Sequence, residues 1–215
     1  MPISHRHKCI FVHIPKTGGV SIEKHFKIKR LTRNLYRHSM YVKFQYYGIW
    51  YPLHHLPADI IKKIHPDTFK KYYKFSFVRN PYNRILSLYL YTHKKKWESM
   101  QNSGVEINDT VLVGISEKFE KWFDKFIQSN DYRKLTQTKF LFENKKLIVD
   151  EVFKFEDMEA ELKKLKQKFK LEFDPHEIHN SSTTMFDRKK LLTPQIKEKI
   201  YNFYKEDFDN FGYEK

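Results

Sequence analysis

The chain has 215 residues, with 41 Lys and Arg against 26 Asp and Glu, which gives a formal net charge of +15. A hydrophobic content of 40% and an aromatic content of 17% exclude a disordered polycation, because disordered chains contain few large apolar side chains. The charge indicates an anionic partner but leaves open nucleic acid, an acidic membrane or glycan surface, and a small polyphosphate. Lysines on solvated faces explain part of the charge equally well.

Cys9 is the single cysteine, which excludes an intrachain disulfide and a multi-cysteine zinc site. It lies in an apolar run over residues 9–14, where we expect a buried thiol of a strand. This run is too short for a signal-peptide core or a membrane span, and the longest uncharged stretch, 44–58, contains two prolines. We expect a cytoplasmic protein without a transmembrane segment. Because no stretch has the composition of a linker, we expect a single domain over residues 1–215.

The apolar run predicts a strand over residues 9–14, followed by a glycine loop over residues 15–19 that leads into a helix over residues 20–26. A second strand is predicted over residues 72–78. It ends at Arg79-Asn80-Pro81, and Asn80 is expected to cap a helix over residues 82–93 that buries Ile85, Leu88 and either Leu86 or Tyr89.

Further elements are expected in the second half of the chain: strands over residues 147–149 and 152–153, an amphipathic helix over residues 157–169, and a last helix over residues 193–212 that carries Ile196, Ile200, Phe203 and Tyr204. Strands that alternate with helices predict an α/β fold of three layers, with a largely parallel sheet flanked by helices. Ligands of such sheets bind at the carboxyl ends of the strands, where both loops lie.

The glycine loop contains the components of a phosphate site: Pro15, Lys16, Thr17, Gly18, Gly19, Val20 and Ser21. Glycines let the backbone approach an oxyanion, Lys16 supplies a charge, and Thr17 and Ser21 supply hydroxyl groups at a helix N-terminus. A tight turn with a solvated lysine is the alternative. The loop is not the nucleoside-triphosphate P-loop, because the lysine precedes the glycines.

Arg79 ends the second predicted strand, and Ser87 follows eight residues later on the next helix. A guanidinium and a hydroxyl group suit a phosphate monoester, for which Arg offers paired donors. A salt bridge of Arg79 to a carboxylate is the alternative. Arg84 either contacts a nucleotide or pairs with a carboxylate, and we favour the structural role.

Residues 13–22, HIPKTGGVSI, and residues 75–89, FSFVRNPYNRILSLY, resemble the donor motifs of carbohydrate sulfotransferases related to the heparan sulfate 2-O- and 6-O-sulfotransferases. The resemblance implies a P-loop-like fold and 3′-phosphoadenosine 5′-phosphosulfate (PAPS) as donor. It implies that the glycine loop holds the 5′-phosphosulfate, with Lys16 on its bridging and sulfate oxygens. It also implies that Arg79 and Ser87 hold the 3′-phosphate. Five downstream stretches are similar to the family as well: residues 135–138, 146–150, 155–156, 179–182 and 207–213.

Transfer to a hydroxyl group needs a proton acceptor, and imidazole suits neutral pH. His54 and His55 lie between the two donor motifs, and the resemblance implies that a histidine of this stretch is the general base. His55 aligns better, but the doubled histidine leaves the register open by one residue. Capping or pairing near a helix start is the alternative. His13 is expected to pack beside the loop.

The interpretation is an O-sulfotransferase that yields 3′-phosphoadenosine 5′-phosphate (PAP) and needs no metal, because cations and helix N-termini supply the positive field. The acceptor is expected to be a glycan or glycoconjugate. Aromatic residues in 28–51 and 94–118 could line its cleft, although packing explains them equally well: Tyr46, Tyr47, Trp50 and Trp97. Asn180 and Ser182 are candidates for a loop over the donor.

A P-loop kinase or NTPase is the alternative, because residues 147–151, LIVDE, imitate a Walker B strand. No specific nucleic-acid motif is present.

Overall fold

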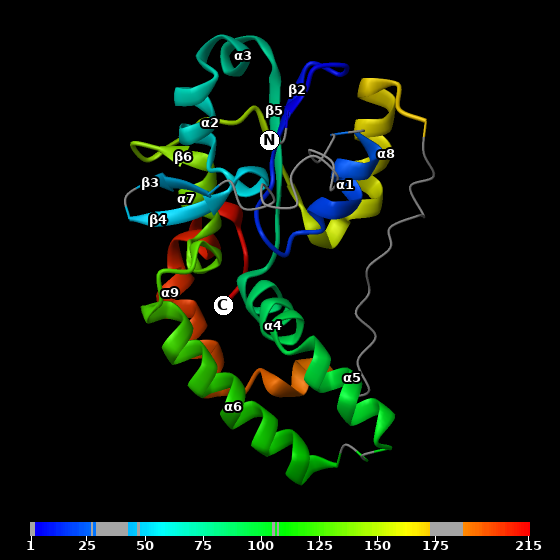
Figure 1. The fold of residues 1–215 in the computed structure, drawn as a ribbon, viewed down its shortest axis with the longest axis vertical. Coiled ribbons are helices and arrows are strands. Elements are labelled where there is room, and N and C mark those ends of the chain that lie inside the picture. The colour runs from blue at the N-terminus through cyan, green and yellow to red at the C-terminus, as the bar shows by residue number, and fades with distance from the viewer. Residues whose placement is uncertain are drawn as a thin grey trace. The chain divides into compact units, whose positions relative to one another are not determined.

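Figure 1 shows the computed structural model of the protein, which describes residues 3–26, 28, 43–46, 48–104, 106, 108–172 and 187–215. The chain divides into two compact units. The first unit comprises Met1–Arg79 and Asn130–Asn180, and the second comprises Asn80–Ser129 and Ser181–Lys215. This division describes internal packing, and the single domain over residues 1–215 stays a prediction.

The first unit contains a four-stranded sheet in the order β1-β2-β5-β8. Its strands are β1 (Ile3–Ser4), β2 (Cys9–Val12), β5 (Tyr73–Val78) and β8 (Glu151–Lys154). Strands β2, β5 and β8 run parallel, and only β1 is antiparallel among the described strands of this sheet. All four residues of β2 are buried, as expected for a central strand of a parallel sheet. The prediction of a mixed α/β fold with a largely parallel sheet is confirmed.

Helices cover both faces of this sheet, with α1 and α8 on one side and α2 and α7 on the other (Figure 1). The helices of the first unit are α1 (Gly19–His25), α2 (Ala58–Ile64), α3 (Pro66–Lys71), α7 (Gln137–Leu141) and α8 (Met158–Phe169), with single 3₁₀ turns at Leu53–His55, Tyr132–Lys134 and Phe155–Asp157. Helix α8 buries Met158, Leu162 and Leu165 against aromatic residues of the strands, which confirms the predicted amphipathic helix.

Two small antiparallel sheets complete the first unit. Strand β3 (Lys43–Tyr46) pairs with β4 (Ile49–Pro52), and β6 (Phe142–Glu143) pairs with β7 (Lys146–Leu147). The strand predicted over residues 147–149 was therefore placed wrongly, because only Leu147 of that range is in a strand, and it belongs to a hairpin instead of the main sheet. Asn144 and Lys145 both have positive φ and form the tight turn that this hairpin needs.

The second unit is helical. It contains α4 (Pro81–Thr92), α5 (Lys94–Asn102), α6 (Asp109–Gln128), a 3₁₀ turn (Arg188–Leu191) and α9 (Pro194–Phe211). The side chain of Asn80 accepts hydrogen bonds from the N–H groups of Tyr82 and Asn83, so the predicted cap of α4 is confirmed. Helix α9 is capped by Thr193 and ends at Gly212 in the left-handed conformation.

The core of the second unit joins α4, α6 and α9 through a continuous apolar cluster. The apolar residues expected on α4 are all buried, namely Ile85, Leu86, Leu88 and Tyr89. On α9, Ile196, Ile200 and Tyr204 are buried, whereas Phe203 is 37% exposed. No helix of the described residues is both long and apolar enough to cross a bilayer.

Candidate functional site

Three connections of the first unit meet at the carboxyl ends of its parallel strands. The register pairs Val12 of β2 with Ser76 of β5, and Ser76 with Val152 of β8. The glycine loop follows β2, Arg79 follows β5, and Phe155 follows β8, so the three connections leave the same edge of the sheet. This is the edge at which open parallel sheets bind ligands.

The glycine loop reverses direction through two residues with positive φ, Lys16 at 70° and Gly18 at 78°. Gly18 precedes α1 as its N-cap. A Cβ atom on Gly18 would lie 2.5 Å from Cε of Met158 and 2.9 Å from the ring of Phe155, and one on Gly19 would overlap the imidazole of His13. Side chains of the protein therefore fill the space beside both glycines. This packing requires glycine at both positions, and the approach of an oxyanion to the loop backbone stays a prediction.

The hydroxyl groups of the loop are buried. Thr17 donates its hydroxyl hydrogen to the carbonyl oxygen of Ile14 at 2.9 Å, which closes the loop onto the end of the strand. Ser21 is buried on the first turn of α1, Pro15 is buried beside it, and Val20 is 50% exposed. The structure thus brings residues 15–21 together as one compact turn, with Val20 at its surface.

Arg79 is held at the end of β5 by its backbone and by its side chain. Its N–H donates to Oε1 of Gln137 at 2.8 Å, and its carbonyl accepts from Nε2 of Gln137 at 2.9 Å. Its guanidinium lies 4.2 Å from the ring centre of Phe155 and donates to the carbonyl oxygen of Lys16 at 3.3 Å. Lys16 and Arg79 therefore belong to the same site. In the sequence, Gln137 lies in a stretch similar to the family, residues 135–138, but no role was predicted for it.

Positive charge is concentrated at this edge. Burial, followed by the charges of Arg79 and Arg133, lowers the pKa of Lys16 from 10.5 to about 8. Arg133 lies on the 3₁₀ turn at residues 132–134, and Asp131 orients it through bonds to its Nε and Nη2 atoms. An anion bound here would offset the mutual repulsion of three cations. The sequence pattern did not identify Arg133.

His55 is oriented by His13, the residue that directly follows β2. Its Nδ1 lies 2.7 Å from the carbonyl oxygen of His13. Because a carbonyl oxygen only accepts, Nδ1 donates the hydrogen, and neutral His55 has its free electron pair at Nε2. This is the tautomer that a general base with an oriented ring needs.

The second histidine of the doublet lies beside the first. The ring centres of His54 and His55 are 4.1 Å apart, and the ring of His13 lies 4.2 Å from that of His55 and 6.0 Å from that of His54. Tyr132 packs 5.5 Å from His55. The structure brings both histidines to the edge where the glycine loop begins, but the oriented Nδ1 bond is found at His55.

Ser87 and Arg84 lie on α4, in the second unit. Ser87 is half-buried. Arg84 is 1% exposed, with its guanidinium 5.7 Å from the ring centre of Tyr204. This packing is consistent with the structural role expected for Arg84, and the shared 3′-phosphate contact of Arg79 and Ser87 stays a prediction.

The proposed acceptor residues have different environments. Trp50, on β4, is 48% exposed, whereas Trp97 packs against the apolar core of the second unit, 6.0 Å from the ring of Tyr89. Tyr46 ends β3. Tyr47, Asn180 and Ser182 lie outside the described residues.

The stretch that imitates a Walker B strand lies at the opposite edge of the sheet. Asp150 immediately precedes β8, so its carboxylate is at the amino end of that strand, where it accepts from the N–H and the Nζ of Lys74 at 2.7 and 2.8 Å. Glu151 accepts from the hydroxyl group of Tyr73. Both carboxylates therefore brace neighbouring chain segments, away from the carboxyl edge that carries the glycine loop. Among the residues the structure places, no group of three or more His, Cys, Asp or Glu residues could hold a metal ion.

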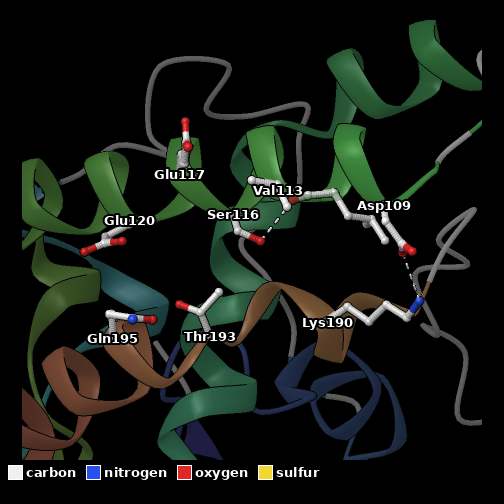
Figure 2. A pocket seen from close by; sticks show the side chains of 9 residues that line it. Asp109, Val113, Ser116, Glu117, Glu120, Lys190, Thr193 and Gln195 are labelled. Atoms are coloured by element: carbon white, nitrogen blue, oxygen red, sulfur yellow. Dashed lines mark hydrogen bonds and ion pairs between the residues drawn. The ribbon is translucent and has the colours of Figure 1, made fainter.

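A groove of about 480 Å³ lies in the second unit, between α6 and the segment that leads into α9 (Figure 2). Carboxylates of Asp109, Glu117 and Glu120 line it, and Lys190 pairs with Asp109 at 3.5 Å. The lining includes none of the residues predicted for the site. The acidic groove is therefore distinct from the cationic edge of the sheet.

Residues 1–214 of this chain match a family model that is described as "Sulfotransferase family". Neither the curated proteins nor the solved structures contain a match.

Proposed function

The chain belongs to the sulfotransferase family, and from this premise we propose that it transfers a sulfuryl group from PAPS to a hydroxyl group of a carbohydrate or glycoconjugate. Membership supports an enzyme of sulfuryl transfer in general. The donor, the acceptor and the roles of individual residues are our proposal, and they rest on the geometry of the first unit.

The observation that carries the proposal is the convergence of Lys16 and Arg79 beside the turn into α1. A lysine whose pKa is lowered to about 8 by burial and by two arginines is arranged for an anionic ligand. The bond from Arg79 to the carbonyl oxygen of Lys16 links the two motifs within one unit. PAPS has the matching chemistry, because it bears a 5′-phosphosulfate for the glycine loop and a 3′-phosphate for Arg79 and Ser87.

In the proposed reaction, Nε2 of His55 accepts the proton of the acceptor hydroxyl group. The acceptor oxygen forms a bond to sulfur while the bond between sulfur and the bridging oxygen of the donor breaks. The electron pair of that bond stays on the 5′-phosphate of the departing PAP. Lys16 and the N–H groups of the glycine loop stabilise this charge, which requires no metal ion. His54 is the alternative base, because it lies beside His55, and the experiments below therefore include a His54 variant.

Two substitutions separate donor binding from proton transfer. We expect His55→Ala to retain the affinity for PAP and to lower turnover by about 10²–10⁴-fold, the range for loss of a general base. In contrast, we expect the main effect of Arg79→Ala to be weaker binding of PAP. Calorimetry with PAP, and release of PAP from PAPS in the presence of a panel of glycans, measure the two effects. The opposite pattern would reassign the two roles.

Matched variants control for general damage. His93 makes the same kind of bond, from Nδ1 to the carbonyl oxygen of Tyr89 at 2.9 Å, in the second unit. His93→Ala should therefore leave turnover unchanged, and His54→Ala should lower it less than His55→Ala. Failure of the wild-type protein both to bind PAP and to release it from PAPS with any glycan of the panel would refute the proposed function.

A further inference from the structure

His13 and Glu23 form a buried pair beneath the glycine loop. Nδ1 of His13 lies 2.7 Å from Oε1 of Glu23, and the two residues are 4% and 2% exposed. His13 follows β2 directly, and Glu23 lies on α1. The bond therefore ties the entrance of the loop to the helix at its exit.

His13 contacts both halves of the proposed reaction centre through different atoms. Its imidazole fills the space beside Gly19, where a Cβ atom would overlap it. Its ring is also stacked on Phe11, at 5.3 Å between ring centres. Its carbonyl oxygen accepts the hydrogen bond from Nδ1 of His55 at 2.7 Å. A displacement of His13 would thus move the donor loop and the base together.

Glu23 determines how the ring of His13 is held. The bond between Nδ1 of His13 and Oε1 of Glu23 fixes the orientation of the imidazole, because the ring cannot rotate without breaking it. A carboxylate beneath an anion-binding loop repels a phosphate. A buried ion pair is also weak evidence for stability, because well-packed apolar residues often replace such pairs without loss. Attraction to the donor therefore does not account for Glu23.

We propose that Glu23 and His13 are positioning residues of the transfer site: the buried bond between them holds the glycine loop in shape and keeps the His13 carbonyl oxygen where it orients His55. The proposal rests on the proposed function, in which the loop binds the donor and His55 is the base. It assigns a task to two buried residues that touch neither reactant.

Two variants of Glu23 test the proposal. Glu23→Leu keeps the approximate volume and removes the acceptor, whereas Glu23→Gln keeps an acceptor oxygen for Nδ1 of His13. We expect Glu23→Leu to lower kcat and to raise KM for PAPS, each by about 10–100-fold, the usual effect of losing a residue that orients a ligand. Glu23→Gln should restore most of both values. Glu143→Gln is the matched control, because it changes an acid that pairs with Lys62 at 2.6 Å on the surface of the same unit.

A double substitution separates positioning from general destabilisation. Because Glu23 acts on transfer partly through His55, Glu23→Leu should lower turnover at saturating PAPS by a clearly smaller factor in the His55→Ala protein than in the wild-type background, while it still weakens PAP binding. An equal loss of turnover in both backgrounds overturns the proposal.

The tautomer of His55 provides a readout that is independent of activity. In protein labelled with ¹⁵N at histidine, the His55 signals are identified by their loss in His55→Ala. The wild-type protein should show Nδ1–H for His55, and Glu23→Leu should shift the population toward Nε2–H, with recovery in Glu23→Gln. An unchanged tautomer in Glu23→Leu overturns the proposal whether or not the protein turns over PAPS. A shifted tautomer in a protein that does not bind PAP would support the positioning while the proposed function fails.

Discussion

The side chain of Gln137 forms two reciprocal hydrogen bonds with the backbone of Arg79, at 2.8 and 2.9 Å. The parallel strand β5 ends at Val78, so the N–H and carbonyl groups of Arg79 have left the ladder of the sheet. Gln137 is fully buried and replaces the missing strand neighbour. A residue outside both donor motifs therefore sets the direction in which the guanidinium leaves the sheet.

Substitution of Gln137 should weaken both stability and donor binding. Gln137→Ala leaves two backbone groups of Arg79 without these partners, and because Arg79 is half-buried each group costs about 1–2 kcal/mol, the lower part of the range for buried groups. We expect the free energy of unfolding to fall by about 2–4 kcal/mol and the affinity for PAP to fall about tenfold, a difference of about 1.4 kcal/mol. Urea denaturation and calorimetry measure the two effects, with Gln167→Ala on the exposed face of α8 as control. Unchanged PAP affinity in Gln137→Ala would show that Arg79 is oriented without it.

Three glycine substitutions should separate backbone strain from steric overlap. Gly18 and Gly48 both have positive φ, but only Gly18 has side chains where a Cβ atom would lie. We expect Gly48→Ala to cost about 1 kcal/mol and Gly18→Ala to cost several times more, with loss of PAP binding. Gly114→Ala, in open space within α6, should stabilise by about 0.5–1 kcal/mol. Equal effects of Gly18→Ala and Gly48→Ala in thermal unfolding would contradict the overlap with Phe155 and Met158.

The elements that were predictable from the sequence are those with local signals. Asn80 caps α4 and Pro81 occupies its first helical position. Both residues act on the backbone of the first helical turn, within four residues of sequence. The spacing of Met158, Leu162 and Leu165 predicts a buried helical stripe, which is what α8 contains. Strand β2 was evident because a continuous apolar run suits a strand that is buried on both faces.

What the sequence did not reveal depends on pairings between distant residues. The hairpin of β6 and β7 turns on Asn144 and Lys145, and the usual glycine signal for two residues with positive φ is missing there. Gln137 and Arg133 reach the site only because their segments pass the carboxyl ends of β2 and β5. The doubled histidine left the register open by one residue, because the bond that orients His55 is made with a carbonyl oxygen 42 residues away, which no local pattern reveals.

Cys9 should be chemically inert in the folded protein. Its side chain is fully buried in β2, and burial raises the pKa of its thiol to about 12. Since the thiolate is the reactive form, an aromatic disulfide reagent at pH 8 should label no thiol in the native state and one thiol per chain in denaturant. Stoichiometric labelling of the native protein within minutes would contradict the buried position of β2.

The pKa of Lys16 predicts that donor binding is coupled to proton uptake. In the free protein the pKa of Lys16 is about 8, and a bound phosphosulfate raises it by favouring the charged form. Affinity for PAP should therefore fall by up to about tenfold per pH unit above pH 8. Calorimetry at pH 8.5 in buffers of different ionisation enthalpy should detect the proton that is taken up. Lys16→Arg, which stays charged, should bind without this uptake, and equal heats in all buffers for the wild type would contradict the coupling.

The buried charge of Lys16 should also lower the free energy of unfolding. Its folded-state pKa of about 8 lies below the unfolded value of 10.5, so the unfolded chain binds more protons between these values and stability rises with pH across that window. At pH 7 the cost of the buried charge is fully present. Lys16→Met keeps the length without the charge and should raise the free energy of unfolding at pH 7 by roughly 1–3 kcal/mol, while it abolishes PAP binding. Lys24→Met, an exposed position on α1, should change neither property. If Lys16→Met is no more stable than the wild type at pH 7, or if its advantage does not shrink by pH 10, then the burial of Lys16 and its repulsion from Arg79 and Arg133 destabilise the protein less than the lowered pKa implies.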